Sequence, residues 1–354
     1  MKLLVEALTL RDFRSYERLE LALAPGLVLV TGENGAGKTN LLESLHVGTQ
    51  GFSPRTRSDA ELIRFARAAA RIELRGRQRE APIEIRLDLS SVQGKRATVN
   101  GARLPAAEQL RREVQTLVFT PDRLAIVKGG PAARRAYFDR VLSRLSPARA
   151  RLSVEYAAAV GQRNAALRRA ARGLSTHAAI APWSDQVTQL GRELVSARLE
   201  AVELLEPLAR TRAYELGLPD MAISYEGEPA SVLDLEARLD HDLERGTTGL
   251  GPHLHDVALR SGNRDLRSFG SQGEQRVTVL ALLLGEAELL ATRFATPPLV
   301  LLDDVLSELD LGRRAALVEL LPEGQTMITA TTREALPAEP VQLLEVTSGE
   351  VRQR

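Results

Sequence analysis

The sequence predicts a mixed α/β protein whose strand-forming core is interrupted by a long helical insertion. Residues 1–31 and 70–119 consist of short apolar or alternating runs, which favour strands. Residues 131–244 have an almost wholly helical pattern, and strand-like runs return after residue 251. Strands on both sides of a helical stretch indicate one α/β core with a separate helical lobe inserted into it. The predicted segments are 1–125, 126–248 and 249–354.

The N-terminal segment opens with the strand-like runs "LLVEALTL", "LELAL" and "GLVLV". A glycine-rich loop follows, and then "TNLLESLHVG", which has the apolar period of a helix and is expected to stop at Gly48. Further along, Asn100-Gly101 separates two alternating runs. This dipeptide predicts a β-hairpin, because both central residues of its turn take positive φ.

The helical insertion contains a heptad-like apolar seam and one proline. We expect Pro207 to break or kink the helix that carries the seam, because proline lacks the backbone donor. The helix from Trp183 to Glu206 would then be about 36 Å long. This length predicts a lobe or short arm and no long coiled coil. The seam consists of Val187, Leu190, Leu194, Ala197, Ala201, Leu204 and Leu208.

The composition limits where this protein works. Its 354 residues are 44% hydrophobic and 26% charged, which is typical of globular proteins. No run approaches eighteen apolar residues and the N-terminus lacks the pattern of a signal peptide, so we expect neither a membrane partner nor export. The absence of cysteine excludes disulfides, thiolate metal sites and cysteine nucleophiles. Together these features predict a cytoplasmic protein.

The net charge of +1 conceals an uneven distribution. Residues 131–172 contain ten Arg and two acidic residues, whereas residues 185–245 contain fourteen acidic residues and six Arg. Such asymmetry indicates either an anionic partner at one surface or two helical faces that neutralise each other. The sequence leaves both readings open.

The loop "GENGAGKT" matches the phosphate-binding pattern G-x-x-x-x-G-K-[ST] in full, and it lies between a predicted strand and a predicted helix. Glycines let the backbone approach phosphates closely, and the helix N-terminus attracts negative charge. Lys38 is expected to reach the β- and γ-phosphates of ATP, and Thr39 to bind Mg²⁺. The predicted nucleotide-binding residues are Gly32, Glu33, Asn34, Gly35, Ala36, Gly37, Lys38 and Thr39.

The run "PPLVLLDDVLSELD" is expected to supply the acidic residues of the same nucleotide site. Its apolar residues predict a buried strand that ends in two carboxylates. Asp303 is expected to hold Mg²⁺, and Asp304 to orient or deprotonate the attacking water. A surface or helix-capping acid is the alternative for Asp304.

Ser271 begins a second anion-binding pattern, in "RSFGSQGEQR". Ser271 and Glu274 form a potential capping box before a strongly apolar helix. The order of phosphate loop, Ser-x-Gly helix and aspartate-ended strand resembles that of ABC-type ATPases, whose signature motif this stretch resembles. The resemblance implies that Ser271 and Gly273 face the ATP of a second chain, in a homodimer that forms on ATP binding. Asp310 in "SELD" resembles the D-loop and is expected at the same interface.

Longer segments resemble the RecF family of bacterial recombination proteins, which is related to SMC heads. They are "FTPDRLAIVKGGPAARRAYFD", "LLDDVLSELDLGRRAAL", "LRDFRSYERLEL", "GPHLHDVAL" and "FGSQGEQR". The resemblance implies a DNA-binding repair protein with an ABC-type ATPase head. Its activity would be weak, DNA-stimulated ATP hydrolysis. It implies binding to duplex and gapped DNA without sequence preference, and cooperation with RecR and RecO in loading RecA.

Several positions depart from the wider ABC pattern. Asp304 stands where many relatives carry Glu, and its shorter side chain predicts slow hydrolysis. Thr331 and Thr332 stand where many have a switch histidine. Gln50, Gln78 and Gln93 are equal candidates for the Q-loop glutamine. His253, His255 and Asp256 form a potential metal site, although we favour an ordinary strand entry.

The DNA-contacting residues are expected among the arginines, because only four of the 47 basic residues are Lys. Aromatic residues are few, which favours contact with the duplex backbone over base stacking. Arg64, Arg67 and Arg71 have the spacing of one helical face. The other candidates are Arg134, Arg135, Arg163, Arg168 and Arg169. A transporter-type ABC ATPase subunit and a small-molecule P-loop kinase remain as alternatives, and the long helical insertion and the signature helix count against them.

Overall fold

The computed structural model describes residues 4–354 except residue 79, and the chain divides into two compact units. The first unit contains the residues up to Leu124 together with Thr211–Pro219 and Arg276–Arg354. The second contains Ala125–Arg210 and Asp220–Gln275. Residues 249–275 therefore lie in the helical unit, because β10 (Asp256–Ser261) pairs with β9 (Met221–Glu226) along its whole length.

The first unit contains a six-stranded sheet in the order β15-β14-β3-β13-β12-β8. Neighbouring strands are parallel except β15, which is antiparallel to β14. All residues of β8, β12 and β13 are buried, as expected for parallel strands covered on both faces. The strands are β3 (Leu27–Thr31), β8 (Thr116–Phe119), β12 (Leu299–Leu302), β13 (Thr326–Thr329), β14 (Gln342–Thr347) and β15 (Glu350–Gln353).

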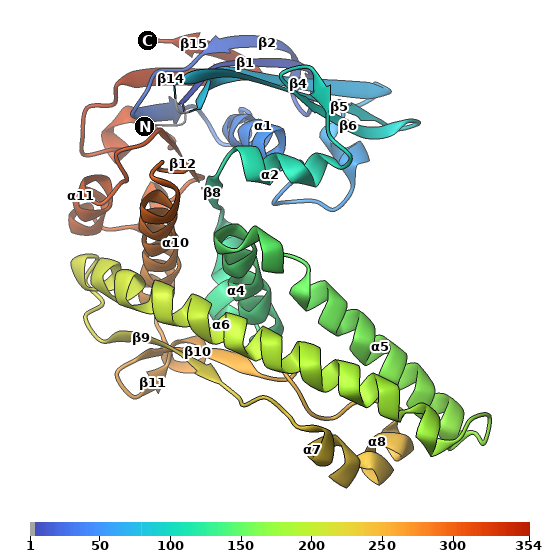
Figure 1. Cartoon of the computed structure of the whole chain (residues 1–354). Helices are drawn as coiled ribbons and strands as arrows, with labels where there is room; N and C mark the ends of the chain where they lie inside the picture. Colours follow the sequence, from blue (N-terminus) through green and yellow to red (C-terminus); the bar gives the residue numbers. More distant parts are fainter. Residues whose placement is uncertain (1–3, 79) are drawn as a thin grey trace. The chain divides into compact units, whose positions relative to one another are not determined.

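A second, antiparallel sheet of the same unit has the order β2-β1-β4-β5-β6-β7. Its strands alternate buried apolar and exposed polar residues, so one face packs inward and the other meets solvent. Figure 1 shows α1 (Lys38–Gln50) and α2 (Leu110–Glu113) on one face of this sheet. The strands are β1 (Leu4–Phe13), β2 (Tyr16–Ala22), β4 (Ala69–Gln78), β5 (Ala81–Ser90), β6 (Gly94–Val99) and β7 (Ala102–Arg103).

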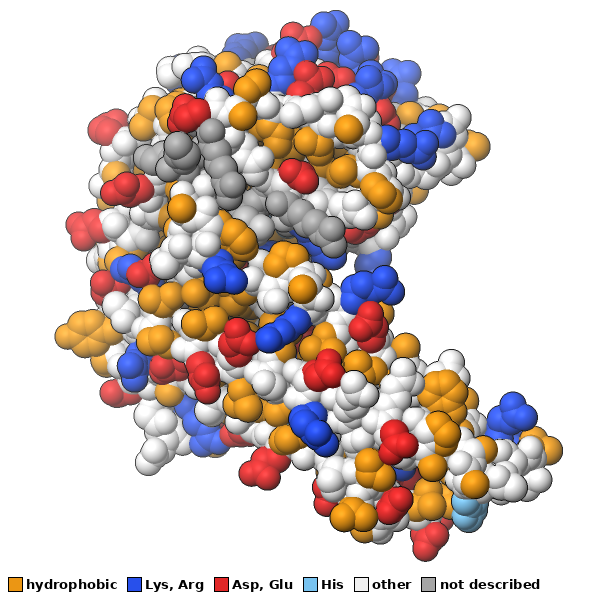
Figure 2. Space-filling view, in the orientation of Figure 1, with side chains coloured by type: hydrophobic (Ala, Val, Ile, Leu, Met, Phe, Trp, Pro, Cys, Tyr) orange, Lys and Arg blue, Asp and Glu red, His pale blue; other side chains and the backbone are white. Residues whose placement is uncertain are grey.

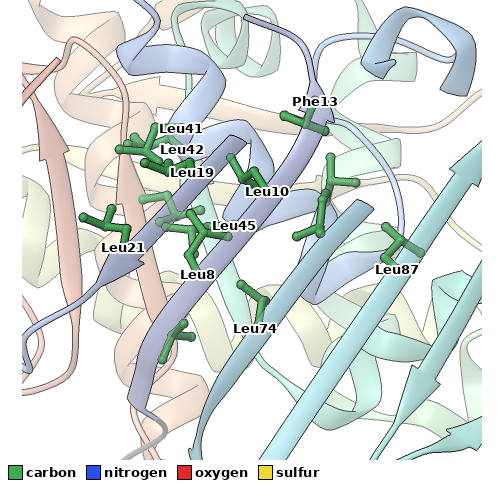
Figure 3. Packing of buried hydrophobic residues seen from close by; sticks show 14 of the residues in the cluster. Leu8, Leu10, Phe13, Leu19, Leu21, Leu41, Leu42, Leu45, Leu74 and Leu87 are labelled. Carbon is green, nitrogen blue, oxygen red and sulfur yellow. The ribbon is translucent and has the colours of Figure 1, made fainter. Parts of the chain in front are cut away.

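The core of this unit joins α1 to the inner face of the antiparallel sheet. In Figure 3, leucines of the strands and of α1 lie together in one apolar cluster, which includes Leu8, Leu10, Leu74, Leu41 and Leu45. Burial of such side chains stabilises the fold by about 25 cal/mol per Å² of apolar surface removed from water. The cluster therefore fixes the start of α1, where the phosphate loop ends.

Two local predictions had different outcomes. The hairpin at Asn100-Gly101 is confirmed, because β6 and β7 pair across it and both residues take positive φ, 48° and 81°. The helix stop at Gly48 is wrong, because α1 continues to Gln50. A Cβ at Gly48 would lie 2.9 Å from Leu74, so this glycine permits close packing on β4. Gly51, with φ of 76°, is the actual C-cap.

Short helices and two longer ones complete the first unit. They are η1 (Asp59–Leu62), η2 (Ala107–Gln109), η3 (Pro121–Leu124), η6 (Leu306–Glu308), α11 (Leu311–Glu319) and η7 (Arg333–Ala335), with α10 (Gln272–Phe294) beginning in the second unit.

The second unit is mainly helical, as predicted, and also contains the small sheet β11-β10-β9. Its other elements are α3 (Ala125–Lys128), α4 (Pro131–Leu145), η4 (Pro147–Arg149), α5 (Leu152–Ala171), η5 (His177–Ala179), α6 (Ala181–Glu215), α7 (Val232–Ala237), α8 (Leu239–Arg245), β11 (Arg264–Asp265) and α9 (Leu266–Phe269). Within the described ranges, none of the helices combines the length and apolarity that crossing a membrane requires.

Pro207 does not break the helix, because α6 of 35 residues runs through it, whereas a kink at this proline stays a prediction. Leu205, Ala209 and Ala213 are fully buried and hold the helix on both sides of the proline. The seam also shifts: Leu204 is 43% exposed, while its neighbour Leu205 is buried. A straight helix of 3.6 residues per turn drifts away from a strict heptad, so the later seam positions turn outward.

Candidate nucleotide-binding site

The phosphate loop joins β3 to α1, and its glycines take conformations that other residues rarely adopt. Gly32, Gly35 and Gly37 have φ of 148°, 85° and 117°. A Cβ on Gly32 would lie 2.3 Å from the carbonyl oxygen of Val346, so only glycine fits there. Helix α1 has no side-chain cap at its start. Its first N–H groups are therefore available to an anion.

Lys38 is 8% exposed and folds back over the loop. Its Nζ donates to the carbonyl oxygens of Gly32 at 2.6 Å and Glu33 at 2.9 Å. Burial lowers the pKa of Lys38, while the charges of Asp304 and Asp303 oppose this shift. The ammonium group thus lies at the loop with two carboxylates close enough to influence it.

Asp303, at the carboxyl end of β12, brings the ends of three elements together. Its Oδ1 accepts hydrogen bonds from the hydroxyl of Thr39 at 3.0 Å and from that of Thr329, at the end of β13, at 2.9 Å. Asp303 is 5% exposed, and this burial raises the pKa of its carboxyl group. Carboxylate and hydroxyl oxygens suit Mg²⁺, so Thr39 and Asp303 fit the predicted metal ligands.

Asp304 is exposed and has an unusual backbone conformation, with φ of 50°. Its N–H donates to the hydroxyl of Thr329 at 2.8 Å, and its carbonyl oxygen accepts from Ser307. Non-glycine residues at positive φ are uncommon and tend to occur at functional sites. The two bonds hold this conformation directly after the buried Asp303, and the following short helix η6 is capped by Val305 and not by Asp304.

A cavity of about 850 Å³ adjoins the loop. Thr331 and Thr332, the expected switch positions, line it together with residues 32–36. Further lining comes from Arg333, Glu345 and Arg354. Among the described residues of the first unit, the loop therefore faces a polar hollow large enough for a nucleotide-sized group.

Ser271 and Gly273 lie in the second unit, whereas the phosphate loop lies in the first. The capping box is confirmed: Ser271 Oγ accepts from the N–H of Glu274 at 3.2 Å, and Glu274 Oε2 accepts from the N–H of Ser271 at 2.7 Å. Ser271 is exposed, and Gly273 and Glu274 are half-buried. Asp310 is also exposed, and it caps α11 by accepting from the N–H of Arg313 at 2.9 Å. A role of these residues toward a second chain stays a prediction.

Comparison with known proteins identifies a family that spans nearly the whole chain. The family model described as RecF/RecN/SMC N terminal domain matches residues 4–352. A DNA replication and repair protein RecF from Heliobacterium modesticaldum is 36% identical over 352 residues, covering 96% of this chain and 95% of that protein. The RecF of Halalkalibacterium halodurans is 31% identical over 369 residues and covers 99% of both chains.

The chain belongs to the RecF family.

Solved structures agree with this assignment. A structure of the recombination mediator protein RecF-ATPrS in the RecFOR pathway superposes with a TM-score of 0.88 at 25% identity, covering 99% of this chain and 98% of the other. The Smc head domain of Pyrococcus furiosus has a TM-score of 0.61 at 15% identity, over 99% and 96% of the chains, which shows a shared fold. The fold is therefore that of an ABC-type ATPase head with an inserted helical lobe, as predicted.

Two site residues were missed in the sequence. Thr329 was hidden because only the pairing of β12 with β13 brings it to Asp303. The charge of Arg55 partly opposes the rise that burial causes in the pKa of Asp303. The sequence contained a hint only for Arg55, which lies in a basic loop soon after the helix that follows the phosphate loop.

None of the Q-loop candidates forms a described hydrogen bond with the phosphate loop. Gln50 is buried and donates to the carbonyl oxygen of Val114 at 2.8 Å. Gln78 donates to the carbonyl oxygen of Glu113, and Gln93 lies in the turn after β5.

The histidines of "GPHLHDV" form separate hydrogen bonds in the second unit. His253 pairs with the hydroxyl of Tyr156 and His255 with that of Tyr225, both at 2.8 Å. Burial lowers the pKa of both rings, so they are neutral near pH 7. Asp256 pairs with Arg134 at 2.6 Å. These partners favour the ordinary strand entry over a metal site.

The arginine candidates for DNA contact divide by burial. Arg134 is 4% exposed, and Arg163 is fully buried and paired with Asp242 at 2.7 Å, so neither reaches a ligand. Arg135 and Arg168 donate to backbone carbonyl groups at 2.5 and 3.1 Å. The ion pairs Arg163–Asp242 and Arg149–Glu200 each join an arginine of the basic stretch to a carboxylate of the acidic stretch, which favours internal neutralisation.

The helical face expected for Arg64, Arg67 and Arg71 is wrong. Arg64 and Arg67 lie in the loop before β4, and Arg71 lies on that strand. The spacing of three and four residues matched a helix by chance, because these arginines are divided between an irregular loop and a strand. Arg169, in the last turn of α5, remains an exposed candidate.

Proposed function

We propose that this chain is an ATP-dependent, DNA-binding recombinational repair protein. The contact that carries the proposal is the hydrogen bond between Thr39 and Asp303. It places a hydroxyl and a buried carboxylate at the start of α1, beside a loop shaped for phosphates. The curated relatives are DNA replication and repair proteins, and a related RecF has been solved with ATP, which supports the same assignment.

ATP binding rests on this chain's own groups. The N–H groups at the start of α1 donate to the β-phosphate, and Lys38 moves from its carbonyl acceptors toward the β- and γ-phosphates. Thr39 and Asp303 would hold Mg²⁺, which would supply positive charge to the phosphate oxygens. Burial raises the pKa of Asp303, and a bound cation would favour its ionised form.

Hydrolysis depends on Asp304. Its exposed carboxylate orients the attacking water and accepts its proton, while Thr329 holds the backbone of Asp304 in place. The short side chain limits how close this base comes to the water. We therefore propose weak ATPase activity that DNA stimulates.

The nucleotide acts as a switch for dimerisation. Ser271, Gly273 and Asp310 of one chain contact the γ-phosphate side of the ATP held by its twin. ADP lacks that phosphate, so only ATP favours the dimer. A preference of about 1.4 kcal/mol per site changes the dimer ratio tenfold, and two sites act together.

The DNA-bound dimer works in the cytoplasm at single-strand gaps, with RecR and RecO as protein partners in loading RecA. Duplex contact is through the sugar–phosphate backbone and is independent of sequence. The RecFOR pathway named for the solved relative supports these partners.

Sedimentation velocity and ATP hydrolysis, measured together, test the proposal. The chain is examined alone, with ATP and Mg²⁺, with ADP and Mg²⁺, and with gapped duplex added. We expect a dimer with ATP only and faster hydrolysis with gapped duplex. Equal dimerisation in ATP and ADP, or hydrolysis unchanged by DNA, would contradict it.

A further inference from the structure

The solvent-facing side of the antiparallel sheet carries a row of arginines. The strand register places Arg11 opposite both Arg18 and Arg71, on the strands at either side of β1. The row continues with Asp88 opposite Arg71, and Arg96 opposite Asp88. One row across five strands thus contains four arginines and one aspartate. Figure 2 shows Lys and Arg side chains gathered over this sheet.

The row is only partly neutralised. Arg71 pairs with Asp88 at 2.6 Å, and Arg18 pairs with Glu20 at 2.7 Å. Arg11 and Arg96 are exposed, and in the described part of the chain no carboxylate forms an ion pair with either. Like charges directly opposite each other destabilise a sheet. Folding alone gives no reason for this arrangement, whereas a bound polyanion would relieve the repulsion.

A hollow of about 520 Å³ lies over the row. Its charged lining has four guanidinium groups and two carboxylates, which gives a net charge of +2. The volume is that of a site for a nucleotide-sized group. The charged lining residues are Arg11, Arg71, Arg86, Arg96, Asp12 and Asp88.

Two exposed apolar side chains lie on chain segments next to residues that line this hollow, one before Ala69 and one before Gln93. Phe65 is 97% exposed and lies in the loop before β4. Arg67 of the same loop forms an ion pair with Asp12 at 3.2 Å. Val92 is 87% exposed, in the turn after β5. The N–H of Ser91 donates to the carbonyl oxygen of Ala68 at 3.1 Å, so the loop and the turn meet at one end of the sheet. The exposed ring of Phe65 therefore belongs to a loop that is tied to Asp12, which lines the hollow, and that leads into β4.

We infer that this face binds unpaired DNA, with Phe65 stacking on a base and Arg11 and Arg96 contacting the phosphates. A ring stacks on any base, but only where the base has no paired neighbour covering its face. A duplex needs arginines but has no use for an exposed ring. The inference rests on the proposed function and adds the place where the single strand of a gap is held.

The test uses the full-length chain with ATP and two fluorescent probes, a fifteen-nucleotide oligothymidylate and a fifteen-base-pair duplex. Phe65→Ala is compared with Val154→Ala, a matched control whose side chain is 65% exposed in the second unit. We expect Phe65→Ala to weaken oligothymidylate binding about tenfold and to leave duplex binding within about twofold. The control keeps both affinities.

A second variant tests the arginines. Arg11→Ala combined with Arg96→Ala should weaken oligothymidylate binding about tenfold and reduce the slope of log K against log salt by about 1.4, since each phosphate contact on a single strand contributes about 0.7. Arg352→Ala, which removes an exposed arginine of the same unit, is the control.

The outcomes separate the two proposals. If the wild-type chain binds neither probe, the proposed function fails as well. If it binds both and Phe65→Ala changes neither affinity, or changes both equally, unpaired DNA is not held at this face. Displacement of the probe by decaglutamate at the concentration at which unlabelled oligothymidylate displaces it would indicate an acidic protein partner instead and would also overturn the inference.

Discussion

Thr39 and Asp303 lie 264 positions apart in the sequence and are joined by a hydrogen bond of 3.0 Å between the threonine hydroxyl and Oδ1 of the aspartate. Thr329 donates to the same oxygen at 2.9 Å, so one carboxylate oxygen receives two hydroxyl groups. Asp303 is buried, and burial disfavours its charged form in the absence of a cation. Burying this carboxylate therefore lowers the stability of the nucleotide-free chain, and binding of ATP with its metal ion would offset that loss.

Asp303→Asn should stabilise the nucleotide-free chain near pH 7. The raised pKa means that ionised Asp303 destabilises the folded state above that pKa, and that the penalty disappears as pH falls through it. The neutral amide removes the penalty and keeps an oxygen acceptor for both hydroxyl groups. We expect a gain on the order of 1 kcal/mol at neutral pH.

Thermal unfolding from pH 7 downward measures this effect. The difference in Tm between Asp303→Asn and the wild-type chain should shrink as pH falls. The same variant should lose the stabilisation that ATP and Mg²⁺ give the wild-type chain. A lower Tm than wild type at pH 7 without nucleotide would show that the charge of Asp303 stabilises the fold.

Tyr16→Phe should weaken ATP binding without unfolding the chain. The hydroxyl of Tyr16 donates to the carbonyl oxygen of Gly37 at 3.0 Å, at the junction of the loop and α1. The N–H of Leu41 also donates to this carbonyl oxygen at 3.0 Å, so the substitution removes one of its two hydrogen bonds. Loss of this tie loosens the loop, which should cost about 1 kcal/mol, or roughly fivefold in the Kd of ATP. Calorimetric titration measures the Kd, and Tyr214→Phe, at a 67% exposed position, is the control. Equal affinities in the two variants would exclude a role for Tyr16.

Ser271→Asp separates the capping role of Ser271 from its proposed role in the dimer. Aspartate caps helices as well as serine does, so α10 should keep its stability. A negative charge facing the γ-phosphate of a second chain should abolish ATP-dependent dimerisation, because like charges repel at close range.

Ser231→Asp is the matched control, since Ser231 begins α7 with a capping box of the same kind. Sedimentation velocity with ATP measures the dimer, and circular dichroism measures the helix content. A Ser271→Asp chain that dimerises like the Ser231→Asp chain would leave Ser271 with its capping role alone.

Pro207→Ala should raise the thermal stability of the chain. Proline in a helix interior costs about 3 kcal/mol relative to alanine, and α6 continues on both sides of Pro207. Because the helix is already formed, we expect part of this cost to be recovered, with a Tm higher by several degrees in scanning calorimetry. An unchanged or lower Tm would show that the proline is already accommodated without cost.

The sequence predicted those parts of the site that depend on local patterns. The phosphate loop, the capping box at Ser271 and the hairpin at Asn100 each follow from residues a few positions apart. Thr329 could not be found in this way, because its role depends on which strand pairs with β12. The same limit applies to Phe65, whose exposure is a property of the folded surface.

Local charge and helix patterns gave wrong predictions at positions whose burial is set by tertiary packing. Arg163 resembled a surface arginine but is buried against Asp242, which lies 79 positions away. Pro207 resembled a helix break, but buried residues on both sides hold α6 together. In both cases long-range burial outweighed the local pattern.

The central claim is that each ATP is enclosed by Lys38 of one chain and Ser271 of another, and a mixing experiment tests it most directly. Lys38→Ala removes ATP binding, and Ser271→Asp removes the contact with the partner's ATP, so neither variant should dimerise alone. The chain has no cysteine, so one introduced cysteine labels each variant uniquely for energy transfer. In the mixture, one complete site forms between the two variants, and ATP should produce energy transfer that ADP does not. A mixture that gives no more transfer with ATP than with ADP, while a mixture of labelled wild-type chains does, would contradict the claim.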